Sequence, residues 1–334
     1  MIAFVVRRLF QAVLVMLTVA LIAFALFNFV GDPINNMVGQ DTSLADRERL
    51  RQELGLNDPF FVQFARFVGH AAQGNFGLSY QQARPVGQII LEKLPATLEL
   101  SFAAAAIALL LGVPMGIYTG LHRKSWVAQA MLAGSLVGVS LPTFLIGILL
   151  ILIFAVLPAA WFGHPWLPSY GRGGVVRLGW WSTGLLTAEG WRAIILPAVT
   201  LALFQMTLIM RLVRAEMIEV LRTDYIKFAR ARGLTNRAIN FGHALKNTLV
   251  PVITITGLQL GSIIAFAVIT ETVFQWPGVG LMFIQAVTFA DIPVMAAYLV
   301  LVGFFFVVIN LVVDLLYYVV DPRLRIGQER ASFG

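Results

Sequence analysis

Hydrophobic residues in this chain fall into long runs separated by short polar segments. Six runs approach or exceed the roughly 20 residues that a helix needs to cross a hydrocarbon layer. A membrane-spanning segment must satisfy its backbone internally, so runs of this length favour helices. The pattern predicts an all-α membrane protein with six transmembrane helices, over Leu9–Val30, Ala96–Leu121, Val127–Leu157, Ala193–Leu212, Val250–Val273 and Pro293–Val320.

Composition supports this reading. Hydrophobic residues make up 59% of the 334 residues and charged residues only 12%, whereas soluble domains carry about 25% charge. The mean hydropathy is +0.83. The net charge of +7 does not indicate nucleic-acid binding, because the basic residues cluster beside the apolar runs as topology signals do. The chain has no cysteine, which excludes disulfides and thiolate metal sites.

Basic residues also orient the helices. Fifteen of the 24 lysines and arginines lie in the N-terminus, the second and fourth loops and the C-terminal tail, which share one side if six runs alternate. The positive-inside rule then places both termini in the cytoplasm. We expect a first helix over 1–30, an extracytoplasmic loop subdomain over 31–95, a five-helix core over 96–320, and a cytoplasmic tail over 321–334.

The first outer loop has helix signals of its own. Ser43 is placed to cap a helix that runs to Glu53, and Pro59 to open a second helix with an apolar face. This face would pack as a lid on the outer helix ends or would dock another protein. Its residues are Phe60, Phe61, Phe64 and Phe67. In the second outer loop, tryptophans are typical of membrane-interface anchors, at Trp161, Trp166, Trp180, Trp181 and Trp191.

Within the runs, small residues recur at four-residue spacing and allow close helix packing, inside this chain or against a second membrane subunit. They are Gly112, Gly116, Gly120, Gly134, Gly138, Gly257 and Gly261. Pro114 and Pro142 lie inside runs and predict kinks.

No enzymatic motif is present. The sequence lacks a phosphate-binding loop, a zinc-protease motif and a nucleophile elbow, and its four histidines are scattered. We therefore expect no catalytic residue, no metal site and no cofactor. Charges within the apolar runs are Glu99, Glu271 and Asp314. Each would line a pathway for a cationic solute, would reach the membrane interface from the end of a run, or would be satisfied by a neighbouring helix.

The fourth-to-fifth loop contains a basic amphipathic stretch that predicts a short cytoplasmic helix near 223–233. Thr223 is expected to cap it, Gly233 to end it in a left-handed turn, and Thr235 to cap the next helix. One face would present Tyr225, Phe228, Ala229 and Arg232, with Lys227 and Arg230 at the rim. This face would seat on a partner protein or on anionic lipid.

These segments resemble the permeases of ATP-binding-cassette importers, and the peptide/nickel-type branch in particular. The resemblance covers nearly the whole chain, at Arg7–Leu9, Gly31–Pro33, Glu53–Leu56, Pro95–Leu100, Asp224–Lys227, Ala229–Leu234, His243–Asn247, Leu249–Pro251, Thr270–Phe274, Trp276–Gly280, Asn310–Tyr317 and Asp321–Arg325. The long first loop resembles the "B" permease of dipeptide and oligopeptide systems. The general family pattern has Glu-Ala-Ala where this chain has Lys227, Phe228 and Ala229, so a glutamate contact does not transfer to Lys227.

The resemblance implies a type I importer transmembrane domain whose 223–233 segment is a coupling helix seated in a cytoplasmic ATPase. The implied coupling residues are Asp224, Tyr225, Lys227, Phe228, Ala229, Arg230, Arg232 and Gly233. The implied partners are a second homologous permease, two ATP-binding subunits, an extracytoplasmic solute-binding protein and membrane lipid. The implied cargo is a di- or oligopeptide, and the implied location is the inner membrane of a bacterial or archaeal cell. Alternatives are nickel or another small solute, a proton-coupled secondary carrier, and a structural scaffold.

Overall fold

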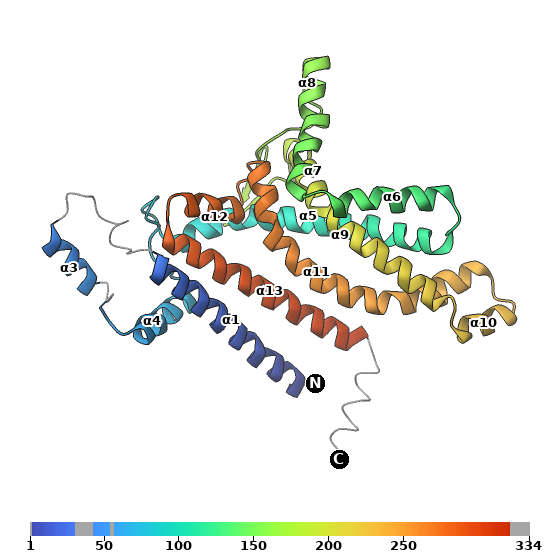
Figure 1. Ribbon diagram of the computed structural model, residues 1–334, viewed down its shortest axis with the longest axis horizontal. Coiled ribbons are helices and arrows are strands. Elements are labelled where there is room, and N and C mark those ends of the chain that lie inside the picture. The colour runs from blue at the N-terminus through green and yellow to red at the C-terminus, as the bar shows by residue number, and fades with distance from the viewer. Residues whose placement is uncertain (1, 31–42, 54–56, 321–334) are drawn as a thin grey trace, which may run out of the picture.

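A computed structural model describes residues 2–30, 43–53 and 57–320. The chain is almost entirely helical (Figure 1). The long helices are α1 (Ile2–Val30), α5 (Val86–Leu121), α9 (Ala188–Val220), α11 (Leu245–Val273) and α13 (Ile292–Val320). Within the described part, five helical segments are long and apolar enough to cross a membrane, at Val6–Ala25, Val86–Leu121, Thr143–Phe162, Ala188–Val220 and Ile292–Leu315, and Gly261–Val273 in α11 is a shorter apolar segment.

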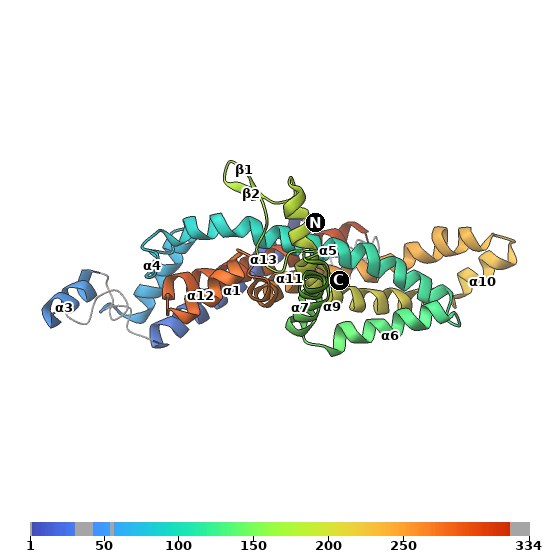
Figure 2. The same ribbon diagram turned by 90° about the horizontal axis from the view of Figure 1, so that it is seen from above.

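Helices α5 and α9 pack along their lengths and form the centre of the molecule (Figures 1 and 2). Their seam depends on glycine. A Cβ on Gly116 would lie 2.5 Å from the Val213 Cβ and 2.7 Å from the Met210 carbonyl oxygen. Gly112 and Gly120 meet α9 in the same way, at Ile209 and Met217. The four-residue spacing therefore serves packing inside this chain, as one of the two interpretations expected.

Most of the other small residues also face a neighbouring helix of this chain. Gly138 faces Thr207 of α9, and Gly257 and Gly261 face α13 at Val313 and Phe306. Gly134 differs, because a Cβ there would meet nothing within 4 Å.

Helix α13 lies between α11 and α1 (Figure 1). Helices α1 and α13 run antiparallel, and Arg8 near the start of α1 contacts Asp314 near the end of α13. The two ends thus lie on the same side of the molecule, as the six-helix prediction required.

The predicted single helix over Val127–Leu157 is wrong. The chain forms α6 (Trp126–Ser140), then α7 (Thr143–Ile151), the π-helical η1 (Leu152–Val156) and α8 (Leu157–Phe162), and α7–α8 leaves the direction of α6 (Figure 1). The break falls at Pro142, because a residue before proline is pushed out of the helical region, and Leu141 is extended with ψ 137°. The expected kink is thus a complete interruption. Helix α5, by contrast, stays helical through Pro114.

The remaining elements lie at the ends and edges of the bundle. They are α3 (Leu44–Glu53), α4 (Phe60–Ala72), the hairpin β1 (Val176–Leu178) and β2 (Trp181–Thr183), α10 (Asp224–Ala231), the π-helical η2 (Ala238–Ala244) and α12 (Val279–Thr288). Strands β1 and β2 pair antiparallel, with Arg177 opposite Ser182. Neither the hairpin nor α12 was predicted. Helices α4 and α12 lie at the opposite end of the molecule from α10 (Figure 1).

The predicted helices of the first loop are present. The Ser43 hydroxyl accepts a hydrogen bond from the Asp46 backbone N–H at 3.2 Å, and Pro59 precedes the first residue of α4. The predicted stop at Gly55 lies outside the described residues. Phe60, Phe64 and Phe67 gather around Phe24 of α1, with ring centroids 5.3 to 5.8 Å apart. Phe61 does not share this face and is 78% exposed, because it lies one residue, about 100°, round the helix from Phe60.

Candidate functional site: the α10 corner and an apolar groove

The α10 corner, comprising residues 221–247, connects α9 to α11 and projects from one end of the bundle (Figures 1 and 2). Its inner face packs against the rest of the chain through Ile226 and Ala229, which are one helical turn apart and buried, with Ile239 of η2 buried beside them. Ala229 was predicted on the outward face with Tyr225 and Phe228. That placement is wrong, because Ala229 shares the inward face with Ile226.

The ends of α10 are partly as predicted. Gly233 has φ +78° and ends the helix in the left-handed conformation. Thr235 accepts a hydrogen bond from the Ala238 N–H at 3.3 Å and caps the helix that leads into α11. The Thr223 side chain does not cap α10. Its hydroxyl instead donates to the Val220 carbonyl oxygen at 2.6 Å, which ties α10 to the end of α9.

The outward face of the α10 corner is aromatic and charged. Phe228 is 64% exposed, and the Arg232 guanidinium lies 5.7 Å from its ring centroid. The Tyr225 hydroxyl accepts a hydrogen bond from Asn247 at 2.5 Å. Leu234 and Phe241 are also exposed and extend this apolar surface. Sequence reasoning overlooked both, although each follows a helix-ending or capping signal within the same basic segment.

The charged residues of α10 lie around this aromatic surface. Lys227 donates to Asp224 at 2.8 Å, and this hydrogen bond holds the pKa of Asp224 below its usual value. Arg230 is exposed, as its predicted rim position requires. The arrangement is a rigid helix with a buried inner face and an exposed aromatic outer face, which suits docking into a concave partner.

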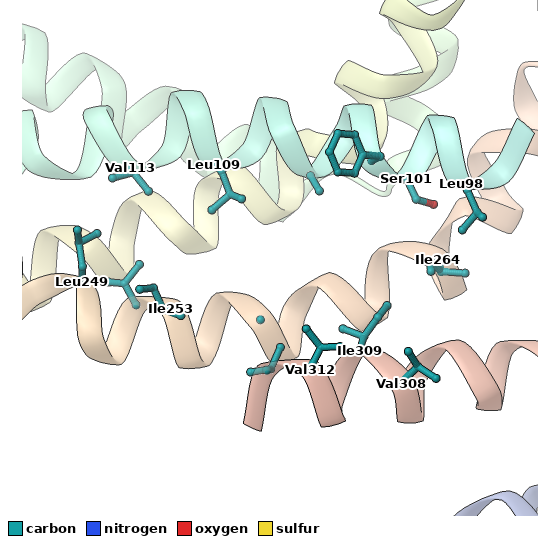
Figure 3. A pocket seen from close by; sticks show the side chains of 15 residues that line it. Leu98, Ser101, Leu109, Val113, Leu249, Ile253, Ile264, Val308, Ile309 and Val312 are labelled. Atoms are coloured by element: carbon teal, nitrogen blue, oxygen red, sulfur yellow. The ribbon is translucent and has the colours of Figure 1, made fainter. Parts of the chain in front are cut away.

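A second feature is an apolar groove of about 470 Å³ between α5, α11 and α13. Figure 3 shows Leu98, Leu109 and Val113 on α5 facing Ile253 and Ile264 on α11. Among the lining side chains that the structure describes, Ser101 alone is polar. The groove is neither a closed cavity nor a flat surface.

The three acids predicted in the apolar runs do not line this groove. Glu99 is buried and accepts a hydrogen bond from Arg172 at 2.5 Å, and the Arg172 guanidinium also donates to the Ser182 carbonyl oxygen at 2.6 Å. This buried ion pair fastens the β1–β2 hairpin to α5.

Glu271 is buried at the end of α11. It accepts hydrogen bonds from the Thr97 hydroxyl at 2.5 Å and from the Leu281 N–H at 2.9 Å. Its carboxylate thus lies at the N-terminus of α12, where free N–H groups favour a negative charge. A Cβ at Gly278 would collide with the Glu271 carboxylate, which explains the glycine.

Asp314 pairs with Arg8 of α1 at 3.0 Å. It faces α1, whereas the groove is lined by Val308, Val312 and Val313 of the same helix. All three acids therefore have hydrogen-bond partners within this chain.

A fourth buried carboxylate was not singled out from the sequence. Asp291, in the turn between α12 and α13, accepts hydrogen bonds from the Ser79 hydroxyl and from the Tyr80 N–H, the latter at 3.1 Å. Burial and the Asp291 charge raise the pKa of Tyr80 to about 12. The signal in the sequence was weak, because a lone Asp before a helix is ordinary. Among the described residues, no group of three His, Cys, Asp or Glu side chains could hold a metal ion.

Known proteins resemble this chain over its whole length. Residues 112–326 match the family described as binding-protein-dependent transport system inner membrane component, and residues 1–101 match the N-terminal family of such components. The dipeptide transport system permease protein of Alkalihalophilus pseudofirmus is 34% identical to this chain. The match covers 97% of this chain and 100% of the relative. The oligopeptide transport system permease protein of Bacillus subtilis is 35% identical, and the match covers 97% of this chain and 100% of the relative.

The di/tripeptide transport system permease protein of Pseudomonas aeruginosa is 37% identical, with 97% of this chain and 99% of the relative covered. Among solved structures, the MetNI methionine ABC transporter in inward-facing conformations matches with a TM-score of 0.51 and 19% identity, over 70% of this chain and 96% of that one. This likeness shows a type I ABC importer transmembrane fold. The chain therefore belongs to the family of binding-protein-dependent transport system inner membrane components.

Proposed function

We propose that this chain is a permease subunit of an ATP-driven importer and forms part of the translocation pathway for di- or oligopeptides. Its peptide-transporting relatives cover 97% of the chain. The observation that carries the mechanism is the α10 corner, where exposed Phe228 and Tyr225 stand on a helix fixed by buried Ile226. A rigid protruding element of this kind transmits the motion of a partner as a rigid body.

The coupling partner is a cytoplasmic ATP-binding subunit, and two such subunits serve two permeases. The positive charge of the 211–246 region supports a cytoplasmic α10 corner. The N-terminus of α1 and the last turns of α13 would lie on this cytoplasmic side. A solute-binding protein would deliver cargo at the opposite side, where α12, α4 and the hairpin lie.

The apolar groove is the wall of the pathway. It is not a closed cavity, and the second permease would cover it. The described lining residues carry no charge, which suits cargo that is recognised elsewhere and only passes here. The packing of Glu99, Glu271 and Asp314 against partners within the chain is consistent with this division.

The test is ATP-dependent uptake by proteoliposomes that contain this chain, the second permease, both ATPases and the binding protein. Radiolabelled alanyl-alanine is the probe, with a proton ionophore in one arm and no ATP in another. We expect uptake that requires ATP and survives the ionophore. Uptake that survives without ATP and collapses with the ionophore would identify a secondary carrier. Uptake of Ni²⁺ but not of dipeptide would favour the nickel alternative.

A further inference from the structure

A second cavity, the hairpin cleft, lies between the first turns of α5 and the β1–β2 hairpin. It has a volume of about 440 Å³, within the size range of small-molecule sites. Figure 2 shows the hairpin standing out from α5. Unlike the apolar groove, the cleft is lined by charged and aromatic side chains, namely Glu92, Lys93, Arg172, Arg177, Trp180 and Trp181.

The charges of the hairpin cleft do not balance. Glu92 is paired with Arg84 through two hydrogen bonds, of 2.5 and 3.2 Å. Lys93 and Arg177 lie within electrostatic range of Glu92, and no acid in the described part of the chain forms an ion pair with either. The three bases Arg84, Lys93 and Arg177 thus surround the single acid Glu92, which leaves an excess of two positive charges at the cleft.

One residue that lines the cleft is buried and paired. Arg172 is 7% exposed and is neutralised by Glu99. Its guanidinium lies 6.0 Å from the Trp276 ring centroid. Its Nε donates no hydrogen bond to any residue that the structure describes, so one buried donor at the cleft is unused. A buried donor without an acceptor is costly, and an incoming anion that reached it would remove the cost.

The wall of the cleft is aromatic. Trp180 is 65% exposed and meets Trp181 edge-on at 5.4 Å between ring centroids. Together with Leu91 of α5, these rings offer a surface for the apolar part of a small ligand.

The cleft is continuous in direction with the apolar groove. Leu91 lines the cleft, and Leu98 and Phe102 line the groove. These positions are i, i+7 and i+11 on α5, which is one face of a helix. The same face of α5 therefore borders both the cleft and the groove, and a ligand could follow it from one to the other.

We propose that the hairpin cleft binds the C-terminal carboxylate of a short peptide before the peptide enters the groove. Lys93 and Arg177 pair with the carboxylate, and Trp180 and Leu91 contact the peptide body. This inference rests on the proposed function, since it assigns to one end of the peptide pathway a selective site that the groove lacks.

The experiment measures binding of alanyl-alanine, and of its C-terminal amide, to the purified four-subunit complex without binding protein. The complex is held in nanodiscs of phosphatidylcholine, and binding is followed by saturation-transfer NMR. The variant is Lys93→Gln/Arg177→Gln. The matched control is Arg192→Gln, which removes an exposed arginine that donates to the Trp166 carbonyl oxygen outside the cleft.

We expect the double variant to weaken binding of the free acid at least tenfold, and the control to leave it unchanged. In the wild type the amide should bind at least tenfold more weakly than the acid, and the double variant should not weaken it further. The conservative variant Lys93→Arg/Arg177→Lys should retain most of the affinity, which shows that charge at these positions is what matters.

Equal binding of acid and amide by the wild type, or unchanged binding by the double variant, would overturn the proposal. Loss of dipeptide binding when phosphatidylglycerol is added would assign the cleft to an anionic lipid headgroup and would overturn it too. The uptake assay distinguishes failure of the cleft inference from failure of the proposed function. If the wild type imports dipeptide with ATP while the cleft variant binds normally, the cleft inference fails and the proposed function stands.

Discussion

Glu99, Arg172 and Trp276 meet where the hairpin, α5 and the α11–α12 loop converge. The Trp276 indole N–H donates to the Ala96 carbonyl oxygen at 2.9 Å, one turn before Glu99. Both members of the ion pair are over nine-tenths buried, and a buried charge without its partner is strongly destabilising. The pair therefore helps to hold the hairpin to the core.

Arg172→Ala should lower the free energy of unfolding by about 3–5 kcal/mol, because Glu99 is left buried and unpaired. Arg172→Lys should recover little, since a lysine cannot reproduce the guanidinium fork. The measurement is the temperature at which half of the detergent-solubilised chain leaves the monodisperse fraction. Arg192→Ala is the control, and a melting temperature for Arg172→Ala equal to that of the control would contradict the account.

Arg8 and Asp314 form a more exposed pair, with side chains 41% and 24% exposed. Its contribution is correspondingly small. A double-mutant cycle of Arg8→Asp, Asp314→Arg and the exchanged pair should give a favourable coupling of about 0.5–1 kcal/mol in thermal stability. If the two single effects simply add, Asp314 does not hold α1 against α13.

At this scale the sequence predicted which residues are unusual, but not what they touch. The acids Glu99, Glu271 and Asp314 stand out as charges in apolar runs. Their partners, Arg172, Thr97 and Arg8, lie 73, 174 and 306 positions away, and no local pattern encodes such distances. Ile226, the buried anchor of the α10 corner, was passed over because helical spacing alone does not say which face of a short helix is covered.

The elements are organised by the seam between α5 and α9. Glycines at 112, 116 and 120 let the two backbones approach closely, and α9 continues as one helix from the hairpin to the α10 corner. The four-residue spacing was readable from the sequence. Its partner helix was not, since the same spacing also suits contact between subunits.

Gly116→Ala should lower the free energy of unfolding by about 1–3 kcal/mol, because the added methyl group would overlap Val213. Gly134→Ala is a matched control in another apolar helix, where a Cβ meets nothing. Removing that glycine should be neutral or stabilise α6 by up to about 1 kcal/mol. Equal melting temperatures for the two variants would show that the seam tolerates separation.

Other elements mark where sequence patterns are insufficient. Pro142 indicated a distortion, but not that α7 and α8 would leave the axis of α6. The hairpin strands are three residues each, too short for an alternating pattern. The apolar residues of α12 continue the apolar runs on either side, so the sequence pattern does not separate this helix from its neighbours. In the structure, the Glu271 carboxylate of α11 lies at the N-terminus of α12.

For the whole molecule, α5 and α9 form one packed pair, with the β1–β2 hairpin towards one end and the α10 corner at the other (Figures 1 and 2). The proposed cargo site and the proposed energy input are thus joined by packed helices rather than by flexible loops. Rigid-body rotation of this unit would open or close the groove between α5, α11 and α13. The all-helical membrane architecture, the shared side of the α1 and α13 ends and the family were within reach of the sequence. The groove was not, because it arises from three helices distant in the chain.

The central claim is that energy enters through the α10 corner. The most direct measurement is co-purification of the ATPase subunits with this chain after Phe228→Asp, compared with Phe61→Asp, which places the same charge on the exposed ring of α4. We predict that Phe228→Asp loses most of the bound ATPase, at least tenfold, while the chain still inserts and melts normally, and that Phe61→Asp retains it. Undiminished ATPase binding by Phe228→Asp would contradict the claim.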